Sequence, residues 1–341
     1  MTGYFARRFL LIIPTFIGIT LAVFVVMHFV PGGPVERQIM RYKMAVATEG
    51  GVGGAAVTVD LPEDALEEMR RYYGFDKPVH VRYAQWLWNL LHLDLGRSYI
   101  YQDPVWDVIK SRFPVSIFLG LTGFFLSYLV CIPLGVWKAI RHGSRFDFAS
   151  SVVVFLGYSV PGWALGTALL VLFGGGSFWS VFPLGGFRPN DWEFLGFFDK
   201  IVAQLHHMFL PVLCYMIGSF ATLTILMKNS LLENLGQDYV RTAFAKGLSE
   251  RRVIFVHALR NSLIPIATGL GHVISLILAG SFLIEKVFNI DGMGYLGYTS
   301  ILQRDYPVAL GILVISSLLM LVGNILSDMI YVIVDPRIRF Q

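Results

Sequence analysis

Six long runs without Asp, Glu, Lys or Arg limit how this chain can fold. They cover residues 9–35, 113–137, 148–187, 201–227, 261–284 and 306–327. About twenty consecutive apolar residues let a helix cross the hydrocarbon core of a bilayer. The pattern therefore predicts an all-α integral membrane protein with six spans, placed near 9–30, 114–137, 148–173, 206–227, 264–284 and 307–334.

Composition agrees with a membrane protein. Apolar residues make up 55% of the chain and charged residues 15%, against roughly 45–50% and 25% in soluble globular domains. The net charge of +4 does not indicate a nucleic-acid partner, because the basic residues lie mostly beside the predicted spans. No recognised nucleic-acid motif is present, so the bilayer is the expected environment and no nucleic acid is expected as a partner.

Two of the six runs need a closer reading. The run 148–187 is 40 residues long, but its glycines at 174–176 and 185–186 and its Pro183 predict that the latter part is a loop or re-entrant segment. The first run follows Arg7-Arg8 and looks like a signal peptide. Its apolar core is too long for one and no small-x-small cleavage site follows, so it is expected to stay in the membrane.

Basic residues in the connecting segments predict the orientation. With the N-terminus inside, segments 1–8, 138–147, 228–263 and 335–341 are cytoplasmic and carry 13 Lys and Arg in 61 residues. The outside segments carry 14 in 136 residues. Cytoplasmic loops are enriched in Lys and Arg, so both termini and the loop 228–263 are expected in the cytoplasm.

The first outside segment, within 31–112, is too long for a simple connection. A flexible glycine-rich stretch, Gly50–Ala56, comes first. A helix is predicted between Pro62 and Gly74, because acidic residues fill its first turn and arginines its last. An amphipathic helix follows from about Val79 to His92, with its apolar side formed by Trp86, Leu87, Leu90 and Leu91. This helical region is either a platform for a substrate-delivery protein or a cap packed on the outer ends of the spans.

One cytoplasmic segment, Asp238–Pro265, carries the most specific pattern and is called the basic segment below. Asp238 is expected to cap a helix over Tyr239–Lys246, because its carboxylate can accept the first N–H groups. Gly247 is expected to end that helix in the left-handed conformation. Ser249 is expected to cap a second short helix. Ala243 and Gly247 are small, so another protein could approach the backbone closely here.

The basic segment resembles the cytoplasmic coupling loop, or EAA loop, of ABC importer permeases. Its form R-T-A-x-A-K-G-(x)9-H-x-L-R-N-x-L-x-P is similar to that of the dipeptide and oligopeptide branch. The matching residues are Arg241, Thr242, Ala243, Ala245, Lys246, Gly247, His257, Leu259, Arg260, Asn261, Leu263 and Pro265. Arg241 stands where the general pattern has glutamate, which favours the peptide branch over the sugar importers.

Other segments resemble the same family in the same order along nearly the whole chain. Pro31-Gly32-Gly33-Pro34 is similar to the branch that imports oligopeptides and the peptide–nucleotide antibiotic microcin C, although most members have Asp at the position of Gly33. The C-terminal third resembles the family's last block, through Glu285, Val287, Phe288, Gly292, Gly294, Arg304, Asp305, Tyr306, Pro307, Asn324, Asp328, Tyr331, Asp335, Pro336 and Arg337.

The resemblance implies the six-helix fold of type I ABC importer permeases, with a large helical extracytoplasmic loop between the first two spans. It divides the chain into an N-terminal segment with the first span (1–35), an extracytoplasmic helical region (36–112) and a five-helix permease core (113–341) containing the coupling loop 228–263. The implied location is the bacterial cytoplasmic (inner) membrane.

The implied partners are a second homologous permease, two ATPase domains or subunits, an extracytoplasmic peptide-binding protein and a peptide substrate. The chain is expected to form half of the translocation pathway. Movement of the ATPase is expected to be transmitted to this chain through the predicted helix Tyr239–Lys246 and the glycine after it. The residues are Tyr239, Arg241, Thr242, Ala243, Ala245, Lys246 and Gly247.

The chain itself is expected to be non-catalytic and to bind no cofactor. It contains no G-x-x-x-x-G-K-[ST] phosphate loop, so ATP and magnesium are expected on the partner ATPase. Cys131 and Cys214 lie within predicted spans and indicate packing rather than a disulfide or metal site. His206 and His207 are adjacent, so they cannot present two ligands on one helix face, and no metal is expected.

Tyr158, Ser159 and Pro161 lie in the middle of the predicted third span. Proline frees a backbone carbonyl in a membrane helix. The resulting kink either opens and lines the substrate pathway or serves helix packing alone.

Three polar residues near span ends are further candidates for the pathway or its gate. Glu285 lies at the outer end of the fifth span, where it either gates the exit or is a solvated interface charge. Asn324 and Asp328 share one face of the last span. Asp328 is expected to pair with Arg260 or Lys228 as a structural clamp, which is favoured over a substrate or proton site.

Two other functions stay open at this stage. One is an ABC permease for another cargo, such as nickel or an oligosaccharide. The other is a self-sufficient, ion-coupled secondary transporter, which is disfavoured because no charge lies near the centre of any predicted span and no inverted repeat is evident.

Overall fold

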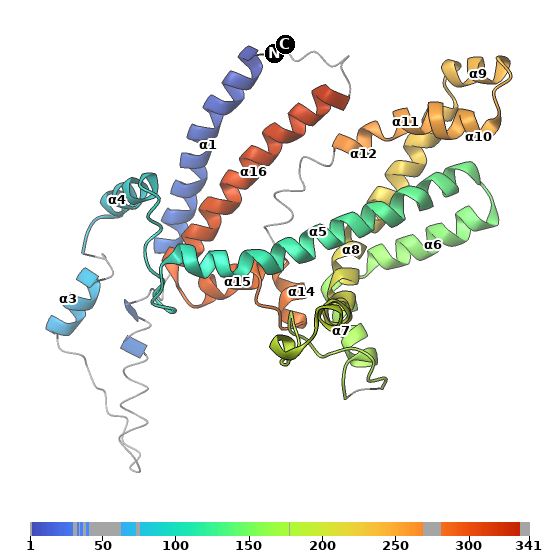
Figure 1. The fold of residues 1–341 in the computed structure, drawn as a ribbon. Coiled ribbons are helices and arrows are strands. Elements are labelled where there is room, and N and C mark those ends of the chain that lie inside the picture. The colour runs from blue at the N-terminus through green and yellow to red at the C-terminus, as the bar shows by residue number, and fades with distance from the viewer. Residues whose placement is uncertain are drawn as a thin grey trace. The chain divides into compact units, whose positions relative to one another are not determined.

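The computed structural model describes residues 2–29, 33, 35–36, 39–40, 63–72, 76–176, 178–268 and 281–334. Within these ranges the chain is built from helices joined by turns (Figure 1). Several sequence predictions lie outside the described residues: most of the Pro31–Pro34 motif, the stretch Gly50–Ala56, the centre of the fifth span (269–280) and residues 335–337.

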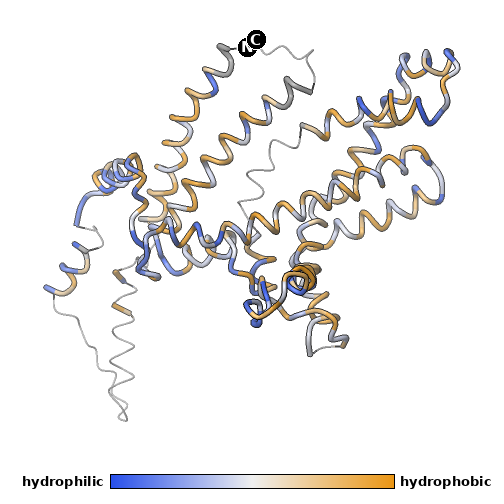
Figure 2. Tube along the Cα trace, in the orientation of Figure 1, coloured by the Kyte–Doolittle hydropathy of each residue, from blue (hydrophilic) through white to orange (hydrophobic). Residues whose placement is uncertain are grey.

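Among the described residues, four helices are long and apolar enough to cross a membrane. They are α1 (Thr2–Phe29), α5 (Val105–Ile140), α8 (Phe197–Leu235) and α16 (Tyr306–Val334). Figure 2 shows them as largely hydrophobic tubes. They coincide with the predicted first, second, fourth and sixth spans.

The predicted third span is not one helix. It consists of α6 (Arg145–Ser159) and α7 (Gly162–Phe173), which meet at a bend of 95°. The break falls at Val160 and Pro161, because proline has no N–H for the helix ladder and forces the residue before it into extended backbone. The kink predicted at Pro161 is therefore present as a sharp bend, and the pair is either a broken span or a re-entrant segment.

The shorter elements follow in chain order. They are α3 (Glu63–Tyr72), α4 (Val79–Leu91), η1 (Trp192–Phe194), α9 (Asp238–Ala245), α10 (Glu250–Arg252), the π-helical η2 (Val253–Ala258), α11 (Leu259–Ser262), α12 (Ile264–Thr268), α14 (Phe282–Val287) and α15 (Met293–Leu302). The helices predicted in the first outside segment are thus present as α3 and α4.

The chain divides into two compact units, each described by itself here. The first contains Met1–Phe9, Arg112–Leu296 and Leu318–Gln341. The second contains Leu10–Ser111 and Gly297–Ser317.

In the first unit, α5 approaches α8 through a stripe of small side chains. Gly123, Ser127, Cys131 and Gly135 recur at every fourth residue and therefore share one face of α5. A Cβ on Gly135 would lie only 2.6 Å from the Cβ of Met227. The Ser127 hydroxyl and the Cys131 thiol each lie 3.5 Å from a backbone carbonyl oxygen of α8. Small residues at this spacing allow membrane helices to pack closely, which confirms the packing role expected of Cys131.

Helix α7 packs on α8 and α14 in the same way. A Cβ on Gly162 would lie 2.7 Å from the carbonyl oxygen of Cys214, and one on Gly166 would lie 2.9 Å from the ring of Phe288. Cys214 and Phe288 are themselves buried in an apolar cluster formed by these helices. The glycines therefore fix the position of α7 after the bend.

In the second unit, α4 packs on the C-terminal half of α1. The ring of Phe24 lies 5.4 Å from that of Tyr83 and 5.9 Å from that of Trp86, measured between centroids. The hydroxyls of Thr20 and Tyr83 are 3.0 Å apart. These contacts agree with the cap alternative for this region. Leu91, on the predicted apolar side of this helix, is 71% exposed.

A buried hydrogen bond also joins distant parts of the second unit. The Ser98 hydroxyl donates to the carboxylate of Asp305 at 2.5 Å, and the N–H of Tyr99 donates to the same group at 3.0 Å. Both Ser98 and Asp305 are almost fully buried. The start of α16 is thereby fixed to the turn that precedes α5.

Candidate functional site

The first helix of the basic segment, α9, begins one residue earlier than predicted. Its N-cap is Gln237, and Asp238 is the first helical residue. Asp238 therefore does not cap the helix with its side chain, which corrects the prediction. Its carboxylate instead lies 3.4 Å from the guanidinium of Arg241, and an acidic residue in the first turn is still favourable to the helix dipole.

The end of α9 is as predicted. Gly247 has φ +78°, in the left-handed region that glycine enters without strain. Its N–H donates to the carbonyl of Phe244 at 2.9 Å, and the N–H of Leu248 donates to that of Ala243 at 3.3 Å. This pair of bonds is a Schellman motif, which satisfies the last carbonyls of a helix. Gly247 therefore ends α9 and turns the chain towards α10.

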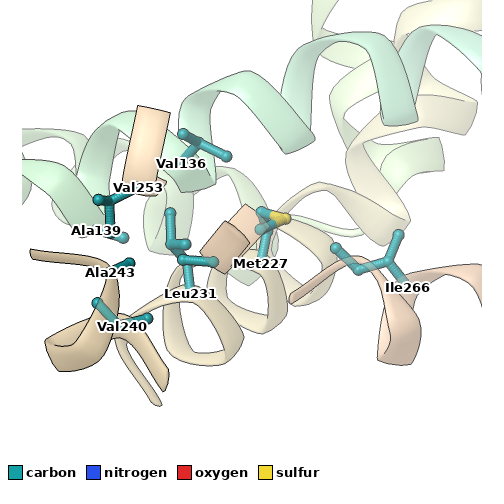
Figure 3. Close-up of a cluster of buried hydrophobic side chains, with 9 residues drawn as sticks. Val136, Ala139, Met227, Leu231, Val240, Ala243, Val253 and Ile266 are labelled. Carbon is teal, nitrogen blue, oxygen red and sulfur yellow. The ribbon is translucent and has the colours of Figure 1, made fainter. Parts of the chain in front are cut away.

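One face of α9 is buried against the ends of α5 and α8 (Figure 3). Val240 and Ala243 of α9 belong to a buried apolar cluster, which we call the loop core. The loop core consists of Val136, Ala139, Met227, Leu231, Val240, Ala243, Val253, Ala258 and Ile266. The expectation that Ala243 offers its small side chain to another protein was wrong, because Ala243 packs inside its own chain.

The other face of α9 is exposed. Tyr239, Arg241, Thr242, Ala245 and Lys246 all lie on it, and so does Phe244. A Cβ added to Gly247 would meet no atom within 4 Å. Phe255 and Val256, from η2, add two more exposed apolar side chains. Six of the seven residues predicted for coupling are therefore open to solvent in this chain.

The second helix of the basic segment differs from the prediction. Ser249 occupies the N-cap position of α10, but its side chain makes no capping hydrogen bond. After one turn the helix becomes π-helical over Val253–Ala258. The segment is tied to α8 by a reciprocal pair, in which the Ser230 hydroxyl donates to the carbonyl of Ser262 at 2.9 Å and the Ser262 hydroxyl to that of Ser230 at 3.3 Å.

Asp328 does not pair with Lys228. It forms an ion pair with Arg8 of α1, whereas Lys228 lies 2.7 Å from the carboxylate of Asp147. Arg260, the other proposed partner, is exposed. The Arg8 pair joins the two helices that contain the first and last predicted spans, and Asn324, one turn before Asp328, is half-buried.

Glu285 is not a solvated interface charge, because none of it is exposed. Its carboxylate accepts hydrogen bonds from the hydroxyl of Tyr215 at 3.1 Å and from the N–H groups of Ser281 at 3.3 Å and Tyr295 at 2.6 Å. Burial raises the pKa of Glu285 above its ordinary value, although the three donors favour the ionised form. The Tyr295 bond also caps the first turn of α15.

Tyr158, Ser159 and Pro161 lie at the bend between α6 and α7, and all three are exposed. The Ser159 hydroxyl donates to the carbonyl of Phe155 at 2.8 Å, one turn earlier. These residues, the Glu285 site and the exposed face of α9 are therefore separate places in the chain. The described contacts do not join them into one site.

Comparison with known proteins identifies the family. The family described as "Binding-protein-dependent transport system inner membrane component" matches residues 131–340. This chain belongs to that family. The matched region begins within α5 and contains the basic segment, the Glu285 site and α16.

Curated relatives match over the whole chain. A peptidoglycan transport system permease protein, YejB, of Agrobacterium fabrum is 39% identical, with 100% of this chain and 99% of the relative covered. An inner membrane ABC transporter permease protein, YejB, of Escherichia coli is 40% identical, and an oligopeptide transport system permease protein, AppB, of Bacillus subtilis is 36% identical, each with full coverage of both chains. The chain is therefore an ABC transporter permease of the inner-membrane type.

Proposed function

We propose that this chain is a membrane subunit of a bacterial ATP-driven peptide importer. The observation that carries this proposal is full-length similarity to permeases named for oligopeptide and dipeptide transport. The relative named for peptidoglycan transport adds peptidoglycan-derived peptides to the substrates that deserve testing. Nickel, oligosaccharide and ion-coupled transport are not supported by any of these relatives.

The proposed complex contains this chain, a second homologous permease, two ATPase domains and an extracytoplasmic peptide-binding protein. In it, the chain crosses the inner membrane six times with both termini in the cytoplasm. The broken α6–α7 pair and the segment 264–284 supply the third and fifth spans. ATP and magnesium belong to the ATPase, because this chain has no phosphate-binding loop.

Coupling is proposed to occur at the exposed face of α9. Tyr239 and Phe244 supply apolar contact, and Arg241 and Lys246 supply positive charge, so the ATPase surface that docks here is apolar and acidic. Because Val240 and Ala243 anchor α9 in the loop core, a push on α9 is transmitted to α5 and α8. A difference of a few kcal/mol between docked states is enough to switch which state is populated.

The pathway is proposed to run past the α6–α7 bend, where Tyr158, Ser159 and Pro161 are exposed. Glu285, buried beside α15, is a candidate for holding the outer end of the pathway in shape. Asn324 and Asp328 are proposed as a structural clamp through Arg8, rather than as a substrate or proton site.

The coupling proposal is tested at Gly247. The positive φ of Gly247 strains any side chain with a Cβ, at a cost of about 1–2 kcal/mol. Because Phe would lie in open space beside α9, the variant is still expected to insert and fold. Transport and peptide-stimulated ATP hydrolysis by the reconstituted complex are expected to fall at least about tenfold. Gly247→Ala is the matched control, since its Cβ carries the strain of the positive φ without the large ring. Normal coupling in Gly247→Phe would show that the ATPase docks elsewhere.

Substrate class is tested on the same reconstituted complex. Peptides of graded length, peptidoglycan-derived peptides, an oligosaccharide and nickel are compared for stimulation of ATP hydrolysis in the presence of the binding protein. Stimulation by peptides alone is expected, and stimulation by the sugar or the metal alone would refute the peptide assignment.

A further inference from the structure

A buried cluster of one carboxylate and two lysines lies beside the loop core, and none of the sequence patterns pointed to it. Asp147, in the first turn of α6, lies 3.1 Å from the ammonium of Lys138 and 2.7 Å from that of Lys228. Lys138 comes from the end of α5, and Lys228 comes from α8. The cluster thus joins three helices through a single carboxylate.

The site around Lys138 is built to hold an ammonium group. Only 1% of Lys138 is exposed. Its three donors reach the carbonyl of Asp147 at 2.9 Å and the hydroxyls of Ser150 and Ser151 at 2.7 and 2.8 Å. Both hydroxyls donate their own hydrogens back to carbonyls of α6, which leaves their lone pairs free to accept from Lys138. The α5–α6 turn is therefore locked to the start of α6.

Lys228 extends this lock to α8. Its ammonium donates to both carboxylate oxygens of Asp147, at 2.8 and 2.7 Å. The remaining contacts of the carboxylate are the N–H of Gly143 at 3.2 Å and the ring of His142 at 3.4 Å. Two ammonium groups on one buried carboxylate leave an excess of positive charge, so the carboxylate cannot be removed without leaving two unpaired cations.

The same turn of α8 also carries the loop core. Met227 and Leu231, on either side of Lys228, are fully buried and pack in the cluster that holds Val240 and Ala243 of α9. Within about one helical turn, α8 therefore packs against α9 on one side and contacts the α5–α6 turn on the other. From Asp147, α6 continues for twelve residues to Ser159, a rise of about 18 Å, and ends at the bend with Pro161.

We propose that Asp147 is a positioning residue that couples α9 to the α6–α7 bend, by holding the α5–α6 turn on α8 through Lys138 and Lys228. A displacement of α9 then moves α5, α6 and α8 together as one rigid body. The movement of α6 displaces Tyr158, Ser159 and Pro161 at its far end. This inference rests on the proposed coupling function. It specifies which contacts carry the movement from α9 to the α6–α7 bend.

The test uses the complete reconstituted transporter with Asp147→Asn and with Lys228→Met. Each variant is expected to hydrolyse ATP but to transport about five- to tenfold less peptide per ATP than the wild-type complex. Lys228→Arg can still donate to the carboxylate. It is expected to keep most of the wild-type ratio of peptide transported to ATP hydrolysed. Arg145→Met is the matched control, because Arg145 is an exposed basic residue on α6, the helix that carries Asp147.

A distance measurement separates positioning from a loss of folding. Spin labels at Cys replacing Ala149 of α6 and Asp238 of α9 report the distance between these helices, since both sites are exposed while the natural Cys131 and Cys214 are buried. In wild-type background the distance distribution is expected to stay narrow with and without ATP. In Lys228→Met it is expected to broaden.

The outcomes are distinct. A lowered transport-to-ATP ratio with a broadened distance supports the inference. Folded Asp147→Asn and Lys228→Met variants with the wild-type ratio overturn it, even if Gly247→Phe uncouples the complex. If Asp147→Asn cannot be purified, the ratio and distance in Lys228→Met decide. If ATP hydrolysis by the wild-type complex proves independent of peptide and of binding protein, the proposed function itself fails.

Discussion

Two buried carboxylates in the first unit are held in opposite ways. Asp147 is paired with the ammonium groups of Lys138 and Lys228, which belong to other helices. Glu285 is fully buried as well, but the groups that donate hydrogen bonds to it are neutral: a tyrosine hydroxyl and two backbone N–H groups. The first site contains an excess of positive charge, and the second contains a carboxyl group without a cation among those donors.

The two carboxylates therefore stabilise the fold in different ways. Charged partners on two other helices make Asp147 a cross-link between three helices, and removal of the carboxylate leaves buried cations. Neutral donors from one short stretch and from α8 make Glu285 a local organiser, which holds the turn before α15 and tolerates protonation. The Asp147 site therefore fixes the relative positions of three helices, whereas the Glu285 site fixes the turn between α14 and α15.

The largest expected effect is the loss of the Asp147 carboxylate. Asp147→Leu leaves Lys138 buried without its counter-ion and should destabilise the protein by about 3–5 kcal/mol. Glu285→Leu removes only hydrogen bonds to neutral donors and should cost about 1–3 kcal/mol. Thermal unfolding of the purified proteins in one detergent compares the two. Equal losses would mean that the charge of the partners does not distinguish the sites.

A smaller effect is expected at Gly292, which lies against Glu285. A Cβ on Gly292 would lie 2.7–2.8 Å from the Glu285 carboxyl atoms, so Gly292→Ala should cost about 1–3 kcal/mol through overpacking. The shorter side chain of Glu285→Asp should recover part of this loss in the double variant. A double-mutant cycle on the unfolding midpoint measures the coupling.

Gly157→Ala is the control for that cycle. Gly157 lies in α6 and an added Cβ would meet no atom within 4 Å, so the substitution should be neutral or stabilising by up to about 1 kcal/mol. If Gly292→Ala behaves like Gly157→Ala, the Glu285 carboxyl is not held where the structure places it.

Local patterns in the sequence were enough to predict the apolar helices and the end of α9. Charge-free runs indicated α1, α5, α8 and α16 because a bilayer excludes unpaired charge. Gly247 indicated the helix end because few other residues adopt its backbone conformation. The stripe of small residues from Gly123 to Gly135 recurs at a spacing of four and indicates a close helix contact on that face of α5, although it does not indicate which helix makes it.

The rest depends on contacts between residues far apart in the chain. Asp147 and Lys228 are separated by 81 positions, and a sequence alone gives Lys228 several possible acidic partners, so Asp328 was chosen wrongly. The exposure of Ala243 could not be judged because α9 is exposed on one face and packed on the other. Pro161 predicted a disturbance of the helix, but its size, a bend of 95°, depends on how α7 packs on Gly162 and Gly166.

The smallest expected effect is a pH dependence that belongs to Glu285. Its pKa is raised in the folded protein, so between the ordinary pKa of glutamate and the raised value the folded state binds more protons than the unfolded state. The free energy of unfolding therefore decreases as pH rises through that window. Glu285→Gln removes this contribution, although its amide places a nitrogen near an N–H donor and lowers stability at every pH.

The difference in unfolding midpoint between wild type and Glu285→Gln should thus be greatest in the acidic range and narrow towards neutral pH. Measurement of both proteins in one detergent, from about pH 4 to about pH 8, gives this difference directly. A difference that stays constant over the range would mean that Glu285 has the same pKa in the folded and unfolded states, so that burial does not raise it. The two buried carboxylates would then be electrostatically alike, and the neutral donors around Glu285 would be sufficient to hold a full charge in the interior.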